Sequence, residues 1–278
     1  MASLLSVENL QVQFQTKKGI NTAVDGVSFS VEKGRILGIV GESGCGKSVT
    51  SMSILQLLGS NARISGGSIK LDGKELIGLP EKEMCRIRGN DIAMIFQDPM
   101  TALNPTLTIG TQLMEPIMLH QNCGKKEAWT RAVDVLKRVG IAAPEKRMKE
   151  YPHQLSGGMR QRVMIAMAVS CEPRLLIADE PTTALDVTIQ AQILELMCEL
   201  REKMGTAIML ITHDMGVVAE TADDVLVLYA GKAVEYGSIE DIFERPKHPY
   251  TQGLLNSIPR LDEDVELLNT IEGTVPAP

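Results

Sequence analysis

The sequence predicts an α/β fold built on a mostly parallel sheet, and three observations predict it. A short apolar run at residues 36–40 leads into the glycine-rich loop Gly41–Ser48 and then into a helical pattern at Val49–Leu58. Three further apolar runs, at 92–96, 175–178 and 207–212, look like buried strands. They alternate with helical patterns, and strands that alternate with helices form parallel sheets covered on both faces.

The stretches before the loop predict antiparallel strands instead. Leu4–Phe14 and Thr22–Val31 alternate apolar and polar residues, as half-buried strands do. Residues 64–71 and the turn at Leu71–Lys74 predict another hairpin. We therefore expect an N-terminal antiparallel β subdomain beside the parallel core.

Residues from about 100 to 168 have a different character. Long helical patterns cover Ile109–Leu119 and Lys125–Val139, and Leu155–Met159 opens another helix. This part predicts a helical subdomain inserted into the α/β core. The parallel pattern then resumes with an amphipathic helix at Ile189–Met204, and a hairpin is expected at 225–236.

Composition excludes some functions. The 278 residues are 44% hydrophobic and carry a formal charge of −7. A general nucleic-acid binder needs a basic face, so this balance predicts no nucleic-acid partner. No apolar run approaches the roughly 20 residues that span a bilayer, so any membrane role is expected to come through a partner. Five cysteines without a C-x-x-C pair fit a reducing compartment.

The loop at 41–48 has the pattern G-x-x-x-x-G-K-[ST], between a predicted strand and a predicted helix. Glycines let backbone N–H groups turn toward phosphate oxygens, and the helix N-terminus adds partial positive charge. Lys47 is expected to reach the β- and γ-phosphates, and the Ser48 hydroxyl to hold Mg²⁺. A chance glycine loop would lack this strand–loop–helix context. The expected nucleotide-binding residues here are Gly41, Glu42, Ser43, Gly44, Cys45, Gly46, Lys47, Ser48 and Val49.

Cys45 allows two interpretations. A thiol inside a phosphate loop can be reactive, or it can be a small residue that fits the space. The sequence favours the second interpretation and leaves the first open.

Two acidic residues and a glutamine follow buried strands. Asp179 and Glu180 close the run at 175–178, and ligands of open α/β sheets bind at that end of the strands. Asp179 is expected to hold Mg²⁺ beside Ser48, and Glu180 to polarise the attacking water. A solvent-facing acidic pair is the alternative, which the upstream loop disfavours. Gln97 closes another apolar strand, and its amide can reach both metal and water.

A second anion site is predicted at 156–158. Ser156 caps a helix, and Gly157 and Gly158 expose backbone N–H groups. His213 also closes an apolar strand, where a lone histidine is more often structural.

These features occur in one order along the chain, and that order and spacing resemble the nucleotide-binding subunit of ABC transporters, with a P-loop (RecA-like) core. The resemblance covers about residues 4–240 and rests on the following features: the loop at 41–48, Gln97, Leu155–Met159, Leu175–Glu180, Ala184–Asp186 and His213. It implies binding of ATP and Mg²⁺ and hydrolysis of ATP.

Residue by residue, the resemblance makes Gln97 the Q-loop glutamine and Ser156–Met159 the signature. It places Asp186 in the D-loop beside the nucleotide and makes His213 the switch histidine at the γ-phosphate. The implied catalytic residues are Glu180, His213 and Gln97, and the implied metal ligands are Ser48, Gln97 and Asp179. Two departures stand out: Met159 replaces the commoner Gln, and Phe14 is the one candidate for stacking on adenine.

Three segments resemble the peptide and nickel importer branch of that family, the oligopeptide/dipeptide permeases. They are Phe96–Pro105, Tyr151–Gln154 and Arg245–Thr251. In that branch the tail continues past a segment like Glu272–Pro276 into a cysteine-rich stretch that can hold an iron–sulfur cluster. This sequence ends at Pro278, before any such cysteines, so either the C-terminal extension at 241–278 is truncated or this member lacks the cluster. We expect no cluster here.

The leading functional interpretation is therefore an ATPase that powers import of di- or oligopeptides from the cytoplasmic face of the membrane. The resemblance implies two transmembrane permease subunits, a second ATPase subunit and, indirectly, an extracytoplasmic substrate-binding protein as partners. Nickel or another small solute is the alternative cargo. An exporter, a non-transport ABC ATPase and a non-hydrolysing nucleotide sensor are the other classes. The tail argues against the exporter, and Glu180, Gln97 and His213 argue against the sensor.

Overall fold

The computed structural model describes residues 3–17, 19–183 and 185–257. The chain forms two compact units, one made of residues 1–79 and 209–278 and the other of residues 80–208. The tail segment Glu272–Pro276 and Ala184 lie outside the described residues. The predicted domain limits at 240 and 241 remain a prediction.

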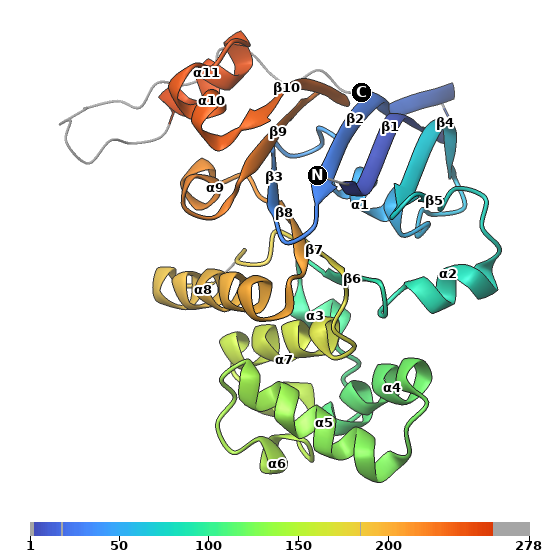
Figure 1. Ribbon diagram of the computed structural model, residues 1–278, viewed down its shortest axis with the longest axis vertical. Coiled ribbons are helices and arrows are strands. Elements are labelled where there is room, and N and C mark those ends of the chain that lie inside the picture. Colours follow the sequence, from blue (N-terminus) through green and yellow to red (C-terminus); the bar gives the residue numbers. More distant parts are fainter. Residues whose placement is uncertain (1–2, 18, 184, 258–278) are drawn as a thin grey trace. The chain divides into compact units, whose positions relative to one another are not determined.

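The first unit contains the antiparallel strands and the strand that carries the glycine-rich loop (Figure 1). Its four-stranded sheet has the order β2-β1-β4-β5, and β1 pairs antiparallel with both β2 and β4. The elements of this unit are β1 Ser3–Thr16, β2 Gly19–Glu32, β3 Ile36–Val40, α1 Lys47–Ile54, β4 Ala62–Leu71, β5 Lys74–Glu75, α9 Met215–Thr221, β9 Asp224–Tyr229, β10 Lys232–Ser238, α10 Ile239–Glu244 and α11 Pro249–Asn256.

In the same unit β3 pairs parallel with β9, and β9 pairs antiparallel with β10. All five residues of β3 are buried, which is why this strand reads as an unbroken apolar run. Val40 lies beside Val227, so the glycine-rich loop leaves the sheet next to the end of β9.

The second unit holds most of the helices. Its elements are α2 Glu81–Ile87, β6 Ile92–Ile95, α3 Pro99–Ala102, α4 Ile109–Gln121, α5 Lys125–Arg138, α6 Pro144–Arg147, a 3-10 turn Pro152–Gln154, α7 Gly157–Val169, β7 Leu175–Asp179 and α8 Val187–Met204. Strands β6 and β7 pair in parallel, with Ile95 beside Ala178. Helices α4, α5 and α7 pack on one another, as Figure 1 shows. β8 Ala207–Ile211 carries the chain from this unit into the first one.

The predicted fold class is confirmed: the chain is mixed α/β, with an antiparallel sheet, a mostly parallel sheet and a helical insertion. Several element boundaries differ by a few residues, and the end of one helix differs most. The helix after the glycine-rich loop, expected to reach Leu58, ends at Ile54 because Gln56 has a left-handed backbone with φ 50°.

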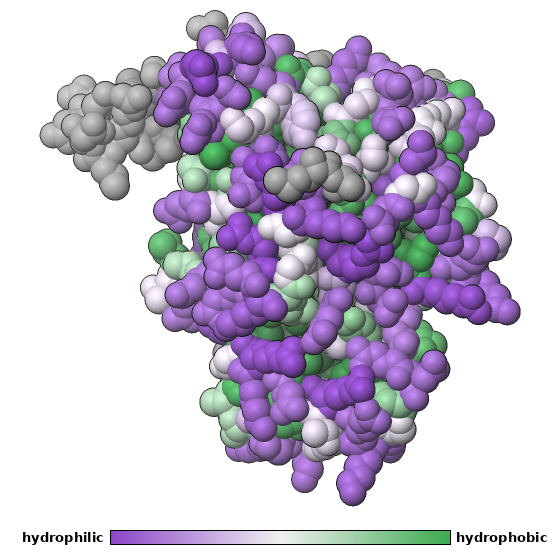
Figure 2. All heavy atoms as spheres, viewed as in Figure 1, coloured by the Kyte–Doolittle hydropathy of each residue, from purple (hydrophilic) through white to green (hydrophobic). Residues whose placement is uncertain are grey.

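Within the described ranges, no helix combines the length and the apolar character that crossing a bilayer requires. The face shown in Figure 2 is largely hydrophilic, with hydrophobic residues in small groups.

Gly38 sets how closely helix α9 approaches β3, the strand that leads into the loop. A Cβ atom at Gly38 would lie 2.8 Å from Val218 Cγ1 and 3.3 Å from Ala222 Cβ. We expect Gly38→Ala to lower the free energy of unfolding by about 1–3 kcal/mol through overpacking. Urea titration followed by circular dichroism measures this change.

Val218→Ala supplies the control, because it removes the atoms that the new methyl group would meet. On its own it should also destabilise, since it leaves a cavity. The double variant should therefore be more stable than the sum of the two single effects predicts. Strictly additive losses would show that this contact does not set the approach of the helix.

Candidate active site

The glycine-rich loop of the first unit has the backbone shape that its sequence predicts. Gly41, Gly44 and Gly46 have φ values of +148°, +84° and +105°, which side chains disfavour. Gly46 is the N-cap of α1, so the loop ends at a helix N-terminus. Its N–H groups and the helix dipole together suit an anion.

Close backbone approach explains two of these glycines. A Cβ atom at Gly41 would overlap the carbonyl oxygen of Leu228 and lie 2.7 Å from Cys45 Sγ. At Gly46 it would lie 2.9 Å from the carbonyl oxygen of Ala23. The loop is thus packed between the end of β9 and β2.

Lys47 lies inside the loop and is only 5% exposed. Its ammonium group donates to the carbonyl oxygens of Gly41 at 2.5 Å and Glu42 at 2.9 Å. Ser48, by contrast, is exposed, as are Ser43 and Gly44. A buried cation next to an open loop suits a phosphate chain, which offers full negative charges in place of carbonyl dipoles.

Cys45 is the small residue that fits rather than a reactive thiol. It is 1% exposed. Burial raises the pKa of its thiol above the ordinary value, although the nearby Lys47 charge opposes that shift. A protonated, buried thiol is a poor nucleophile.

His213 and Phe14 also belong to this unit. His213 follows β8 after Thr212 and is exposed. The next residue, Asp214, caps α9 by accepting from the N–H groups of Gly216 and Val217. Phe14 lies on β1, half-buried and paired with Asn21.

The second unit brings Gln97 and Glu180 together. Gln97 Nε2 donates to Glu180 Oε2 at 2.8 Å, and the hydroxyl of Thr183 donates to the same oxygen at 3.0 Å. Asp179 ends β7 and is 6% exposed. Glu180 has φ 47°, a left-handed conformation that is rare outside glycine and common at functional sites.

Ser156 and Asp186, the residues predicted to belong to the signature and the D-loop, each cap the start of a helix. Ser156 Oγ accepts from Met159 N–H at 3.4 Å at the start of α7, and the Asp186 carboxylate accepts from Ile189 N–H at 3.0 Å at the start of α8. A Cβ atom at Gly158 would lie 3.3 Å from Ile189, so the two helix starts pack together. Gly157 is exposed and faces open space.

Two residues near the site were not predicted from the sequence. Thr183 holds the Glu180 carboxylate, and its place three residues after that glutamate in a turn was the available signal. The hydroxyl of Tyr250 accepts from the N–H of Glu42 in the glycine-rich loop at 3.1 Å. Tyr250 lies in a segment that we singled out only for its resemblance to peptide importers.

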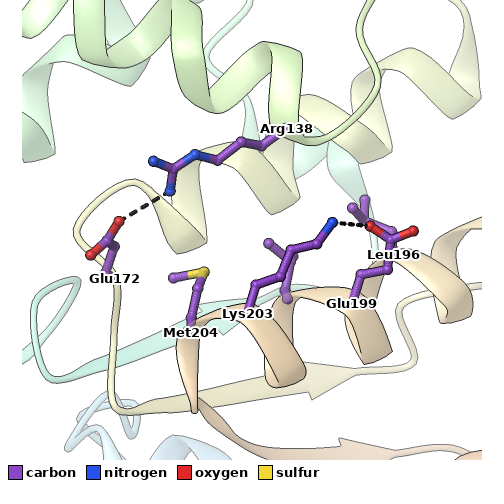
Figure 3. Close-up of a pocket in the computed structure, with 7 residues that line it drawn as sticks. Arg138, Glu172, Leu196, Glu199, Lys203 and Met204 are labelled. Atoms are coloured by element: carbon purple, nitrogen blue, oxygen red, sulfur yellow. Dashed lines mark hydrogen bonds and ion pairs between the residues drawn. The ribbon is translucent and has the colours of Figure 1, made fainter.

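A cavity of about 500 Å³ in the second unit is separate from the predicted residues (Figure 3). Arg138 pairs with Glu172 at 3.1 Å on one side of it, and Lys203 pairs with Glu199 at 2.6 Å on the other. Leu196, Leu200 and Met204 complete the lining. Because each charge already has a partner of opposite sign, this cavity offers no net positive field to a nucleotide.

Comparison with known proteins identifies the family. The family model described as "ABC transporter" matches residues 24–183, and the model "Oligopeptide/dipeptide transporter, C-terminal region" matches residues 234–278. The chain belongs to the ABC transporter family. It is an ABC-type ATPase, and its ATP-binding cassette contains the glycine-rich loop described above.

Curated relatives of this ABC ATPase match it along almost its whole length. It is 57% identical to the oligopeptide transport ATP-binding protein AppD of Bacillus subtilis, over 100% of this chain and 85% of that protein. It is 55% identical to the oligopeptide transport ATP-binding protein OppD of Escherichia coli, over 99% of this chain and 81% of that protein.

A solved ATP-binding cassette has the same fold. It is a dimeric cassette in a post-hydrolysis state, bound to ADP and Pi. The TM-score is 0.76 at 27% sequence identity, over 84% of this chain and 98% of that one.

The close contact between Gly41 and the Leu228 carbonyl oxygen can be tested by substitution in this ABC ATPase. We expect Gly41→Ala to weaken ATP binding about tenfold to a hundredfold, because the loop must move away from Leu228. Gly44→Ala is the matched control: Gly44 also has positive φ, but nothing lies within 4 Å of its added Cβ. Gly44→Ala should therefore weaken ATP binding only by the conformational strain of an alanine at positive φ, about 1 kcal/mol. Equilibrium binding of a fluorescent ATP analogue compares the two, and equal losses would contradict the role of packing at Gly41.

Proposed function

We propose that this chain is the ATP-hydrolysing subunit that powers import of di- or oligopeptides, bound peripherally to the cytoplasmic face of the membrane. The observation that carries the proposal is that one chain joins an ABC transporter match to the oligopeptide/dipeptide transporter C-terminal region. The relatives named above are peptide transport proteins, which favours peptides over nickel as the cargo.

In this proposal the loop from Gly41 to Val49 holds the triphosphate of ATP. Lys47 exchanges the carbonyls of Gly41 and Glu42 for phosphate oxygens. The positive φ values of the glycines and the buried ammonium support this role. Phe14, half-buried on β1, is proposed to stack on the adenine.

Ser48, Asp179 and Gln97 are proposed to hold Mg²⁺. A hydroxyl, a carboxylate and an amide oxygen are the hard oxygen donors that this ion prefers. Gln97 uses its Nε2 toward Glu180, so its amide oxygen is the group left to face a metal. The ion would neutralise negative charge on the phosphates as it develops.

Glu180 is proposed to orient and polarise the attacking water. Its carboxylate is fixed by two neutral donors, Gln97 and Thr183, which orient it without adding a positive charge. His213 is proposed to contact the γ-phosphate. Its exposure directly after a buried strand supports this role.

The proposed partners are two transmembrane permease subunits, a second ATPase subunit and, indirectly, an extracytoplasmic substrate-binding protein. A short permease helix is proposed to dock on the stretch Gln97–Asn104 and the helices that follow it. Exposed apolar side chains on this stretch and beside it support the proposal: Met100 is 57% exposed and Leu107 is 36% exposed. Asp98 caps α3 by accepting from Met100 N–H, which fixes the exposed turn.

Glu180→Gln is the substitution that tests the function. The amide keeps the shape of the side chain but loses the charge that polarises water, so hydrolysis should fall about a hundredfold to ten-thousandfold. ATP binding should persist. A strain that lacks the chromosomal copy and makes this variant should fail to take up a labelled tripeptide, whereas the wild-type chain should restore uptake.

Glu195→Gln, on the exposed face of α8, is the matched control and should behave as wild type. Near-normal ATP turnover by Glu180→Gln would overturn the assignment of Glu180. Normal tripeptide uptake in the deletion strain, with loss of nickel uptake instead, would overturn the peptide assignment.

We also propose that two ATPase subunits pack head to tail, so that the Ser156 helix of one caps the nucleotide held at Lys47 of the other. The partner is a related but distinct ATPase in the full transporter, and a homodimer can form in isolation. The chain has two separate anion sites, and one nucleotide needs only the first. The dimeric form of the solved relative supports this arrangement.

Specific ATPase activity of the isolated chain should then rise with protein concentration. Ser156→Arg should abolish activity while leaving ATP binding at Lys47 unchanged. Ser60→Arg, on an exposed turn before β4, controls for an added arginine. Steady-state assays over a range of concentrations, with mass measured by light scattering, make the test. Constant specific activity from a verified monomer would rule out the composite site.

A further inference from the structure

The C-terminal region reaches the phosphate loop through one side chain. Tyr250 belongs to the part that matches the oligopeptide/dipeptide transporter region, yet its hydroxyl accepts from the Glu42 N–H of the loop at 3.1 Å. The ring centroids of Tyr250 and Tyr229 lie 4.4 Å apart, and Tyr250 is 7% exposed. Tyr250 is therefore buried against the loop.

The segment around Tyr250 is anchored independently of the loop. Helix α11 has Pro249 at its first position, and His248 Nδ1 caps it by accepting from Tyr250 N–H at 3.1 Å. The Glu235 carboxylate on β10 accepts from the N–H groups of Lys247 at 2.8 Å and His248 at 3.1 Å. These bonds tie the start of α11 to β10 and hold the tyrosine in place.

Glu42 is held on both sides of its backbone. Its N–H donates to Tyr250, while its carbonyl oxygen accepts from Lys47 Nζ at 2.9 Å and from Cys45 N–H at 3.3 Å. Tyr250 thus fixes Glu42, and the carbonyl oxygen of Glu42 is one of the groups that hold the Lys47 ammonium. Burial also raises the pKa of Tyr250 to about 12, so the hydroxyl remains protonated at neutral pH.

We propose that Tyr250 is a positioning residue of the phosphate loop, through which the C-terminal region sets the affinity for ATP. This inference rests on the proposed role of residues 41–49 in holding the triphosphate. Tyr250 acts through Glu42 and touches no reacting group. Loss of the hydroxyl leaves the Glu42 N–H without its acceptor and lets the loop relax. Nucleotide binding must then restore the loop shape, so the loss falls on binding and not on the chemical step.

Tyr250→Phe removes the hydroxyl and keeps the ring. We expect its Kd for a fluorescent ATP analogue and its KM for ATP to rise about fivefold to tenfold, the size of one hydrogen bond. Its kcat at saturating ATP should change less than twofold. Tyr236→Phe is the matched control: its hydroxyl also bonds the backbone, in this case by donating to the carbonyl oxygen of Ser30 at 3.2 Å. This control should leave Kd, KM and kcat unchanged.

A Kd within twofold of wild type would overturn the inference, even with a lower melting temperature, because the tyrosine would then serve stability alone. An equal rise in Kd for Tyr236→Phe would also overturn it. Lys47→Ala separates this inference from the function on which it rests. If Lys47→Ala binds ATP normally, the role of the loop itself fails. If Lys47→Ala loses binding while Tyr250→Phe keeps it, only the role of Tyr250 fails.

Discussion

The first unit depends on a buried positive charge. Removing an ammonium group from water costs several kcal/mol unless nearby groups compensate. At Lys47 the carbonyls of Gly41 and Glu42 do so, and they can turn inward because glycine at 41 accepts a backbone shape and a close contact that a side chain would block. The carbonyls offer only partial charges, so a phosphate is a stronger partner. In the proposed function, the loop is therefore held in shape by an interaction that a phosphate would replace.

The second unit contains a negative charge, the carboxylate of Glu180, that neutral side chains hold in place. A carboxylate that polarises water must be oriented, yet an adjacent cation would weaken its pull on a proton. In the role proposed for Glu180, the neutral donors Gln97 and Thr183 orient the carboxylate and add no positive charge of their own. The buried side-chain amide of Gln161 on α7 donates to the backbone carbonyl of Pro181, the residue that follows Glu180. The helix that begins at Ser156 is thus bonded to the turn that carries Glu180.

Much of this could be predicted from the sequence, because the relevant signals are local. The unbroken apolar runs of β3 and β7, the glycine spacing and the serine at the start of α7 lie within a few residues of what they specify. Contacts between distant residues leave no such trace. Tyr250 and Glu42 are 208 positions apart, and no local period records that their backbone and hydroxyl meet. Short helices such as α10 and α11 were also missed, since six or eight residues are too few to show a helical period.

The negative charge of the chain does not prevent it from binding a polyanion. Salt screens charges beyond about 8 Å at physiological ionic strength, so most of the net charge of −7 is not felt at the loop. At the proposed site a phosphate would meet local groups: the Lys47 ammonium, backbone N–H groups and the N-terminus of α1. Glu42 is acidic and lies within the loop, but the bonds that it makes to Tyr250 and Lys47 come from its backbone N–H and carbonyl groups. In the proposed function, affinity for nucleotide follows from the shape of this loop, and a contact that fixes that shape, such as the one proposed for Tyr250, would act on binding.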